Sequence, residues 1–450
     1  MSCSRVRRER SNSPLPNAGS SDAYCALPPA FGSGEFDLSR LTRLQDIACP
    51  WQRPALDALY SVAMTELPLT IEGGDELIHR VASVNVTDDQ TVWALLQFQD
   101  LQAEPRVARL TPGADAWSVL GDITLPAPDQ APGLFVRAGQ VFANAVVGDG
   151  VGVVTWDGEA WQPLPDSAGE VPFLANGVSA DASRLVGNRL LESGRVDTPW
   201  IRGPGGDFVE LQGSAALGLP MPLFTSNDGT RVFGTRWLPR PSVGTYVAYF
   251  VSWPDEGEPQ VVTSADGWRL AAPGACADDC RVAFGAVASR NPTLGFTPPV
   301  TRQQPWYWRT DGRSGVLGEL PTLPGSRYSV HGAAGDANTV VGAGGRFVSF
   351  SSDDHANAVA NPAVDVPGPA LTAATPQIDG FVWMPDVGMT SVSAWLAEAG
   401  IELPDLASLY ALAISPDGRS IFLFGILPAV GSGPGTPALA LLSLEPLSSR

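Results

Sequence analysis

A short pattern recurs along the chain and limits the folds available to it. It consists of a small or polar residue, an Asp at a turn, and an apolar strand that often ends in Gly, as in the copy from Gly177 to Gly187. An Asp side chain accepts hydrogen bonds from nearby backbone N–H groups, which favours tight turns. We therefore interpret the recurring Asp as a turn residue and not as a calcium ligand, which would need several converging oxygens. The predicted turn residues are Asp88, Asp181, Asp228, Asp278, Asp336 and Asp417, with Arg137 in the equivalent place of a degenerate copy.

The spacing of these copies predicts the architecture. Successive copies lie 44 to 58 residues apart, except for a last step of 81 residues. A period of roughly 40 to 50 residues with four short strands is typical of a propeller blade. Between the copies, Asp-Gly pairs such as Asp157-Gly158 and Asp311-Gly312 separate apolar runs, which indicates hairpins. The sequence thus predicts an all-β fold, a β-propeller with seven four-stranded blades.

The predicted domain organisation has two parts. Residues 1–60 form a short, partly helical N-terminal extension that is flexible at its start, and residues 61–447 form a single propeller. The expected blades are about 80–122, 133–166, 173–213, 222–264, 270–321, 329–400 and 409–447, with an inserted loop at 351–376. The segment Ser61–Ile71 would supply a fourth strand to the last blade and so close the ring. Helices are expected only at Leu38–Ile47, Pro54–Met64 and Ser391–Ala399.

Charge and composition exclude several functions. The chain has 28 Arg and no Lys, so it can hold neither a Walker A loop nor a Schiff-base lysine. With 47 acidic residues and a net charge of −19, it is poorly suited to nucleic acid or anionic lipid. No apolar run is long enough for a transmembrane helix. The basic N-terminus is not followed by an apolar stretch, so no complete signal peptide is visible.

The cysteines favour an extracytoplasmic location. Two close pairs and one remaining residue are typical of an exported protein with disulfides. We predict that Cys25 pairs with Cys49 and Cys276 with Cys280, the alternative being five unpaired thiols. Cys3 is a candidate for lipidation, although no lipobox precedes it.

Several segments carry a family resemblance. Val178–Gly187 and Trp308–Pro321 resemble the HAF repeats of bacterial extracellular proteins, as does Phe381–Gly400 together with the following Ala413–Gly418. Ser415–Phe422 also resembles the repeats of TolB-like propellers. Both resemblances imply a secreted or envelope β-propeller, and neither implies a reaction, because propellers host many functions.

The sequence offers few residues for catalysis. It has three histidines, His79, His331 and His355, and no metal-binding His or Cys motif. We expect His331 either to pack against neighbouring residues or to be solvated. We interpret Asp353-Asp354-His355 as a solvated charge cluster in a loop. We predict no catalytic, metal or cofactor site. The expected function is a monomeric, non-enzymatic module that binds or scaffolds a protein or glycan at the envelope or outside the cell. The alternative is a lyase or glycan hydrolase that acts at the mouth of the central channel.

Overall fold

The fold was examined in a computed structural model, which divides into two compact units, Met1–Arg53 and Pro54–Arg450. The structure describes residues 3–5, 23–25, 56, 59–99, 104–126, 133–165, 172–190, 196–213, 220–240, 245–253, 258–263, 269–289, 301–302, 304–320, 327–345, 378–428 and 435–447. The expected loop at 351–376, the expected helix Leu38–Ile47 and the cluster around His355 lie outside these residues.

The unit Met1–Arg53 contributes one pair of short strands to the description. Strand β1 (Cys3–Arg5) pairs antiparallel with β2 (Ala23–Cys25), and Cys3 lies opposite Cys25 in the register. Cys49 lies outside the described residues. The pairing of Cys25 with Cys49 and the lipidation of Cys3 therefore remain predictions.

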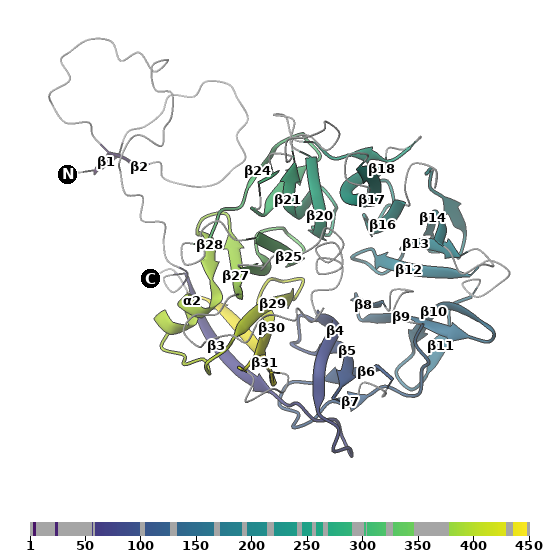
Figure 1. The fold of residues 1–450 in the computed structure, drawn as a ribbon, viewed down its shortest axis with the longest axis horizontal. Coiled ribbons are helices and arrows are strands. Elements are labelled where there is room, and N and C mark those ends of the chain that lie inside the picture. The colour runs from purple at the N-terminus through teal and green to yellow at the C-terminus, as the bar shows by residue number, and fades with distance from the viewer. Residues whose placement is uncertain are drawn as a thin grey trace, which may run out of the picture. The chain divides into compact units, whose positions relative to one another are not determined.

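The unit Pro54–Arg450 is an all-β propeller, with its sheets set around a centre (Figure 1). Three sheets have four antiparallel strands each. They consist of β4 (Ile78–Val86), β5 (Val92–Phe98), β6 (Arg106–Leu110) and β7 (Ser118–Val119); of β8 (Leu134–Arg137), β9 (Gln140–Val147), β10 (Gly150–Trp156) and β11 (Trp161–Pro163); and of β12 (Phe173–Val178), β13 (Leu185–Leu190), β14 (Val196–Arg202) and β15 (Phe208–Glu210).

Two further sheets are larger. The nine-stranded sheet contains β16 (Pro220–Thr225), β17 (Val232–Arg240), β18 (Thr245–Trp253), β19 (Gln260–Val261), β20 (Arg269–Cys276), β21 (Val282–Ser289), β22 (Thr301–Arg302), β23 (Trp306–Arg309) and β24 (Ser314–Val316). The eight-stranded sheet contains β25 (Arg327–Ala333), β26 (Val340–Gly345), β27 (Ile378–Met384), β28 (Gly388–Ser391), β29 (Ser408–Ile414), β30 (Ser420–Ile426), β31 (Pro437–Pro446) and β3 (Tyr60–Leu67).

The prediction of seven four-stranded blades is wrong. The described strands of the propeller form five sheets, of which only three have four strands. Single residue pairs join strands that the repeat pattern assigns to separate blades: Tyr249 pairs with Ala271 between β18 and β20, and Ile378 pairs with Ser408 between β27 and β29. A period in the sequence marks repeated units, but it cannot show where the backbones of two units come close enough to share a hydrogen-bonded pair.

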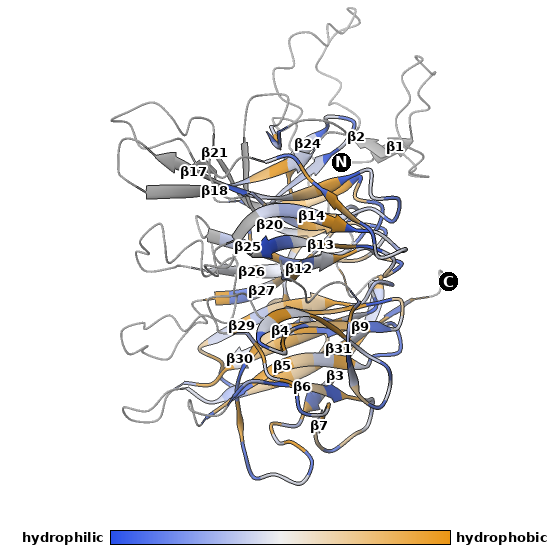
Figure 2. Cartoon of the chain, turned by 90° about the vertical axis from the view of Figure 1, so that its right-hand side faces the viewer, coloured by the Kyte–Doolittle hydropathy of each residue, from blue (hydrophilic) through white to orange (hydrophobic). Residues whose placement is uncertain are grey.

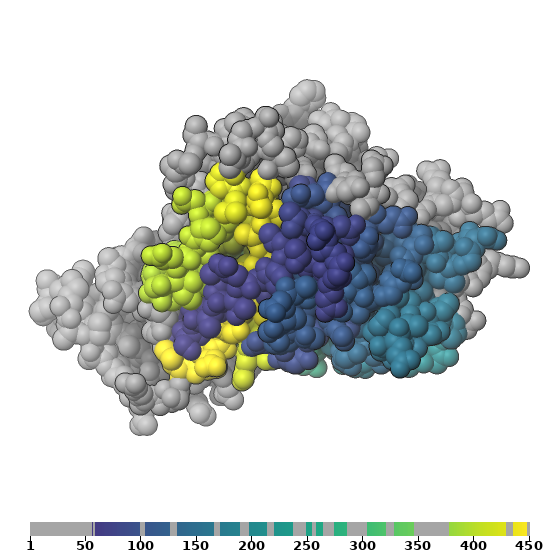
Figure 3. Space-filling view, turned by 90° about the horizontal axis from the view of Figure 1, so that it is seen from below, coloured from purple at the N-terminus to yellow at the C-terminus, as the bar shows by residue number. Residues whose placement is uncertain are grey.

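The eight-stranded sheet is completed by strands that are far apart in the sequence. Strand β3 runs antiparallel to β31, from Tyr60 opposite Pro446 to Leu67 opposite Leu439. Figure 3 shows these purple and yellow segments side by side. The expected pairing of an early strand with the last repeat is thus present, and the strand begins at Tyr60. The predicted helix Pro54–Met64 is wrong over its second half, because Tyr60–Met64 lies in β3.

One α-helix is described, and it follows β28. Helix α2 (Val392–Glu398) lies within the helix predicted at Ser391–Ala399. The Ser391 hydroxyl accepts a hydrogen bond from the Ala394 N–H (3.0 Å), as expected of an N-cap residue. The buried Asp379 carboxylate accepts hydrogen bonds from the hydroxyls of Ser391 and Ser393 (2.5 Å each), and burial raises the pKa of this carboxyl.

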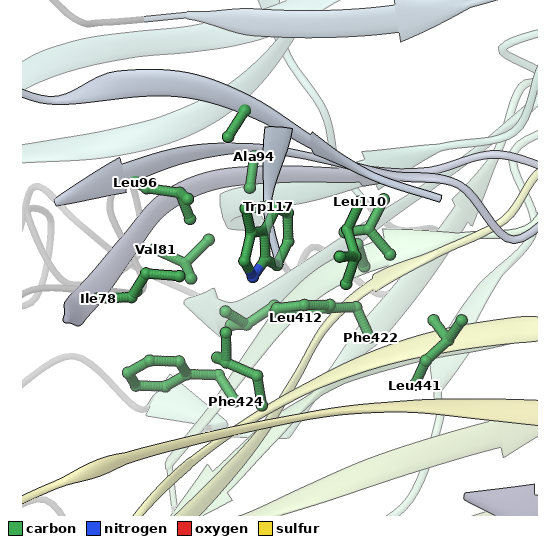
Figure 4. Close-up of a cluster of buried hydrophobic side chains, with 14 of the residues drawn as sticks. Ile78, Val81, Ala94, Leu96, Leu110, Trp117, Leu412, Phe422, Phe424 and Leu441 are labelled. Atoms are coloured by element: carbon green, nitrogen blue, oxygen red, sulfur yellow. The ribbon is translucent and has the colours of Figure 1, made fainter. Parts of the chain in front are cut away.

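Apolar side chains fill the space between sheets. The largest cluster joins β4–β6 to β29–β31, and Trp117 lies fully buried within it (Figure 4). Its indole N–H donates to the Pro68 carbonyl (2.8 Å), so the burial leaves no unsatisfied donor. Phe422 and Leu412 contact the same cluster from the other sheet, and burial of each such side chain contributes about 1.5–3 kcal/mol. Figure 2 shows hydrophobic colour along strands such as β5 and β30 and hydrophilic colour at many of the turns.

The first strand of each antiparallel meander faces the centre in Figure 1; we call these the inner strands. They are β4, β8, β12, β16, β20, β25 and β29. Some neighbouring inner strands approach closely because one carries glycine. A Cβ atom on Gly177 of β12 would lie 1.8 Å from the Leu223 carbonyl oxygen of β16, and one on Gly274 would lie 1.8 Å from the Val330 oxygen. Any other residue at these positions would push the two strands apart.

Polar side chains also form hydrogen bonds from one sheet to the inner strand of the next sheet. Buried Asn144 on β9 donates to the Ala175 carbonyl (2.8 Å) and accepts from the Ala175 N–H (2.9 Å) on β12. Asn188 on β13 donates to the Pro220 carbonyl (3.0 Å) on β16. Strands β12 and β16 lie at the edges of their sheets, and these bonds satisfy backbone groups there, which is the usual requirement for burying them.

Candidate functional site

The turns that follow the inner strands, except the one after β8, share one local geometry. In the turn after β16, the Asp228 carboxylate accepts hydrogen bonds from the Thr230 N–H (3.0 Å) and from the Ser226 hydroxyl (2.5 Å). These bonds, led by the one from Ser226, lower the pKa of Asp228 to about 2. The carboxylates of Asp181, Asp336 and Asp417 likewise accept from the N–H two residues later (2.9 to 3.0 Å). We call these segments the inner turns.

In two inner turns, the aspartate that accepts the hydrogen bond from the N–H two residues later is not the predicted one but the next residue. After β4 the Thr91 N–H donates to Asp89 (3.2 Å), and after β20 the Arg281 N–H donates to Asp279 (2.8 Å). The predicted residues, Asp88 and Asp278, stand at the preceding position. Each of these turns has two consecutive Asp residues, so the pattern alone could not tell which carboxylate turns back onto its own backbone.

The residue immediately before the aspartate that bonds to its own turn, such as Asp88 or Asp278, forms a hydrogen bond with the neighbouring inner turn. The Asp417 N–H donates to the Asp88 carboxylate (2.9 Å), and the Asp278 N–H donates to the Gly335 carbonyl (3.0 Å). The Gly335 N–H in turn donates to the Pro416 carbonyl (2.8 Å). An equivalent bond runs from the Asp181 N–H to the Asn227 side-chain oxygen (3.1 Å). Hydrogen bonds therefore connect the inner turns to one another around the centre of the propeller.

Charged groups from separate turns meet at this end of the propeller. Arg137, the last residue of β8, donates to the Val136 carbonyl (3.0 Å). Burial lowers the pKa of Arg137, and the negative charge of Asp278 opposes that shift. Arg137 lies on β8 and Asp278 follows β20, which belongs to a different sheet, and each charge shifts the pKa of the other group across the space between them.

The acidic groups around that space influence one another. Asp278 is exposed, yet the surrounding atoms desolvate it enough to raise its pKa. Repulsion from Asp88, Asp279 and Asp336 raises that pKa further, while Arg137 lowers it. We call Arg137, Asp88, Asp278, Asp279 and Asp336 the mouth cluster. Four carboxylates around one guanidinium leave an excess of negative charge, which favours a cationic group over an anionic one.

The arrangement gives no support to a metal centre. Within the described ranges, no group of three or more His, Cys, Asp or Glu residues is placed to hold a metal ion. The carboxylates of the mouth cluster interact through space and do not converge on a single point. What the geometry offers is a charged surface, held in place by bonds between turns.

A second polar arrangement involves His331 on the inner strand β25. The Nδ1–H of His331 donates to the Ala411 carbonyl of β29 (2.9 Å), and the Ser329 hydroxyl donates to Nε2 (2.6 Å). Burial lowers the pKa of His331 to about 4, so the imidazole is neutral at pH 7. A hydroxyl bonded to a neutral imidazole resembles an activated nucleophile. Ser329 is only 8% exposed, however, and the pair closes the space between two inner strands, so we assign it a structural role.

The other predicted residues are dispersed. Cys276 is the last residue of β20 and Cys280 lies in the inner turn that follows it, whereas His79 lies on β4. The sequence did mark Arg137, as the basic residue in a degenerate repeat. It gave no signal for Asn144, Asn227 or the contact between His331 and Ala411, since each depends on which strands become neighbours.

No family model and no curated protein matches this sequence. Among solved structures, the chain is similar to the β-propeller domain of the Trilobed protease from Pyrococcus furiosus (7% identity, 83% of this chain and 98% of that one, TM-score 0.47). It is also similar to a putative TolB from Agrobacterium tumefaciens (12% identity, 58% and 90%, TM-score 0.33) and to an oligogalacturonate lyase in complex with manganese (14% identity, 86% and 97%, TM-score 0.45). These similarities concern the fold, and they extend over proteins of different function. In the described part of the chain, no helix is long and apolar enough to span a membrane.

Proposed function

We propose that this chain is a non-enzymatic, extracytoplasmic β-propeller that binds or scaffolds another macromolecule. The observation that carries the proposal is the linked set of inner turns, which holds the four aspartates of the mouth cluster in a fixed arrangement. The resemblance of the repeats to HAF and TolB-like repeats supports the extracytoplasmic part of the proposal.

The contact surface in this proposal is the mouth cluster, and the partner is a protein that presents Lys or Arg side chains. Backbone N–H groups of one turn are bonded to the next turn, so little conformational entropy is lost when a partner binds. The carboxylates of Asp88, Asp278 and Asp336 supply complementary charge. Arg137 limits the number of cationic groups that the mouth can accept.

The test measures binding of a fluorescent tetra-arginine peptide by anisotropy at low and physiological salt. The double variant Asp88→Asn/Asp278→Asn removes two charges and keeps an acceptor for the Asp417 N–H. We expect at least a tenfold weaker Kd for this variant, and tighter binding for Arg137→Gln, because each change acts through local charge. The matched control is the double variant Asp157→Asn/Asp311→Asn, which removes two charges from outer hairpins.

Equal losses in Asp157→Asn/Asp311→Asn and in Asp88→Asn/Asp278→Asn would mean that only the net charge of −19 attracts the peptide, and the proposal would fail. The same variants test the enzymatic alternative. Turnover of polygalacturonate or a cell-wall glycan by the unaltered protein, abolished by Asp278→Asn, would replace binding with catalysis at the mouth.

A further inference from the structure

Most inner turns contain a hydroxyl that braces the Asp. In the turn after β16, the Ser226 oxygen donates to Asp228 and accepts from the Arg231 N–H (3.1 Å), so one hydroxyl ties the start of the turn to its end. The same pair of bonds is made by Ser179 (to Asp181, and from the Arg184 N–H at 3.0 Å) and by Ser415 (to Asp417, and from the Ser420 N–H at 2.9 Å). After β4, the Thr87 hydroxyl donates to Asp89.

The inner turn after β20 has no residue that could form this brace. Ala277 occupies the position of the serine, as shown by the turn bond from the Cys280 N–H to the Ala277 carbonyl (2.8 Å). The equivalent bond in the β16 turn runs from the Gly229 N–H to the Ser226 carbonyl (2.9 Å). The turn after β25 also has an alanine, Ala334, but there the Asn338 side chain donates to the second oxygen of Asp336 (2.8 Å).

Two cysteines enclose the turn that lacks the hydroxyl. Cys276 is the last residue of β20, and Cys280 occupies the left-handed position of the turn (φ 49°). Both are thiols in the structure, and the thiol of Cys280 lies within hydrogen-bonding reach of that of Cys276. Both pack against a buried aromatic cluster that includes Phe233 and Phe250. A disulfide here would join the start and the end of the turn, as the serine hydroxyl does elsewhere.

We propose that Cys276 and Cys280 form an intramolecular disulfide that braces this inner turn in place of the missing hydroxyl. The bond holds the turn that carries Asp278 and Asp279, and Arg231 of the preceding turn donates to the Asp279 carbonyl (3.1 Å). The disulfide does not depend on a ligand at the mouth cluster. An experiment can therefore disprove the disulfide without disproving the proposed binding function, and the reverse.

The chemistry requires an oxidant disulfide, such as oxidised glutathione or a thiol–disulfide oxidoreductase. The thiolate of Cys276 or Cys280 attacks the oxidant disulfide and forms a mixed disulfide, with release of one oxidant thiol. The other cysteine then attacks the mixed disulfide and displaces the second oxidant thiol. The Cys276–Cys280 bond replaces two S–H bonds, and the S–S bond of the oxidant is broken. The two protons and two electrons pass to the oxidant, which leaves as two thiols. Burial raises the pKa of the Cys276 thiol well above its usual value, so attack is fastest before the turn packs against its neighbours.

Peptide mapping tests the bond directly. The full chain is refolded with reduced and oxidised glutathione, free thiols are blocked with N-ethylmaleimide in denaturant, and the protein is digested with trypsin. Cleavage after Arg269 and Arg281 releases residues 270–281, which contain Cys276 and Cys280 and no other cysteine. We expect this peptide to be unlabelled and about 2 Da lighter than its dithiol form, with the difference lost on reduction. Two maleimides on this peptide would overturn the proposal.

The bracing role has its own test. Cys276→Ala/Cys280→Ala should lower the midpoint of thermal unfolding by a few degrees, as expected when a short covalent loop is lost. Adding Ala277→Ser to that background should restore part of the loss, because it returns the hydroxyl found in the β16 turn. The same substitution in the unaltered chain should change the midpoint little. Equal effects of Ala277→Ser in both backgrounds would mean that the cysteines do not perform the function of the serine.

Discussion

Asn144 links two sheets with an amide, whereas His331 links two inner strands with an imidazole. Asn144 is fully buried and makes two hydrogen bonds to Ala175, one to its carbonyl and one from its N–H. His331 makes one bond to the Ala411 carbonyl and receives another from Ser329. Both side chains satisfy backbone groups where one repeated unit meets the next. The amide keeps this role at every pH, but the imidazole keeps its own only while Nε2 is unprotonated.

The largest effect is expected from Asn144→Ala. This change leaves the N–H and carbonyl of Ala175 buried without these partners, at about 1–3 kcal/mol for each group. We expect a loss of about 4 kcal/mol in the free energy of unfolding, measured by urea denaturation at pH 7. Asn338→Ala, at an exposed position, is the control and should cost less than about 1 kcal/mol. A loss below about 1 kcal/mol for Asn144→Ala would show that the Ala175 groups find other partners.

The second effect is a pH dependence that arises at the imidazole link. The pKa of His331 is about 4 in the folded chain, against 6.5 for an ordinary histidine. Between those values only the unfolded chain binds the proton, so stability falls as the pH drops from about 6.5 to about 4, by up to about 3 kcal/mol. Urea midpoints measured across this range should therefore decrease. The His331→Gln variant serves as the control, and a slope unchanged in that variant would assign the pH dependence to other groups.

A smaller effect is expected where an amide makes one bond across the sheets. Asn188→Ala removes the donor to the Pro220 carbonyl and the contact with the Asn176 amide. We expect a loss of about 2 kcal/mol, half of that for Asn144, because one backbone group and not two loses its partner. If both variants lose the same free energy, the number of backbone partners does not set the strength of the link.

Ser329→Ala should have the smallest effect. It removes the hydroxyl that donates to Nε2 and leaves the bond from Nδ1–H to Ala411 in place. We expect about 1 kcal/mol from urea denaturation at pH 7. A loss larger than that of His331→Gln would show that Ser329 holds the two strands together through contacts other than the imidazole.

What could be predicted from the sequence depended on short-range chemistry. The inner turns follow from Asp spacing because an Asp side chain bonds to its own backbone two residues later. The helix at Val392 begins within one residue of its predicted start for the same reason, since turn residues and hydrophobic runs are local.

What could not be predicted depends on which segments become neighbours. Repeats do not show that Tyr249 pairs with Ala271, and so they gave seven blades where five sheets are present. The proximity of Arg137 to Asp278 joins residues from separate sheets, and no spacing in the chain indicates it. In the β4 and β20 turns, both of two consecutive Asp residues satisfied the pattern, and only the backbone geometry selects Asp89 and Asp279.

The pairing of β3 with β31 has a consequence for folding order. A nascent chain makes Tyr60–Leu67 before the other strands of the propeller, but it makes the partner strand Pro437–Pro446 after all of them. Until then, β31's place beside β3 is empty, and β3 has an unpaired edge that can template aggregation. Contacts of such high sequence separation also slow folding. A circular permutant that joins β31 to β3 through a short loop would make this sheet from adjacent segments, and its ring should close faster than that of the natural order.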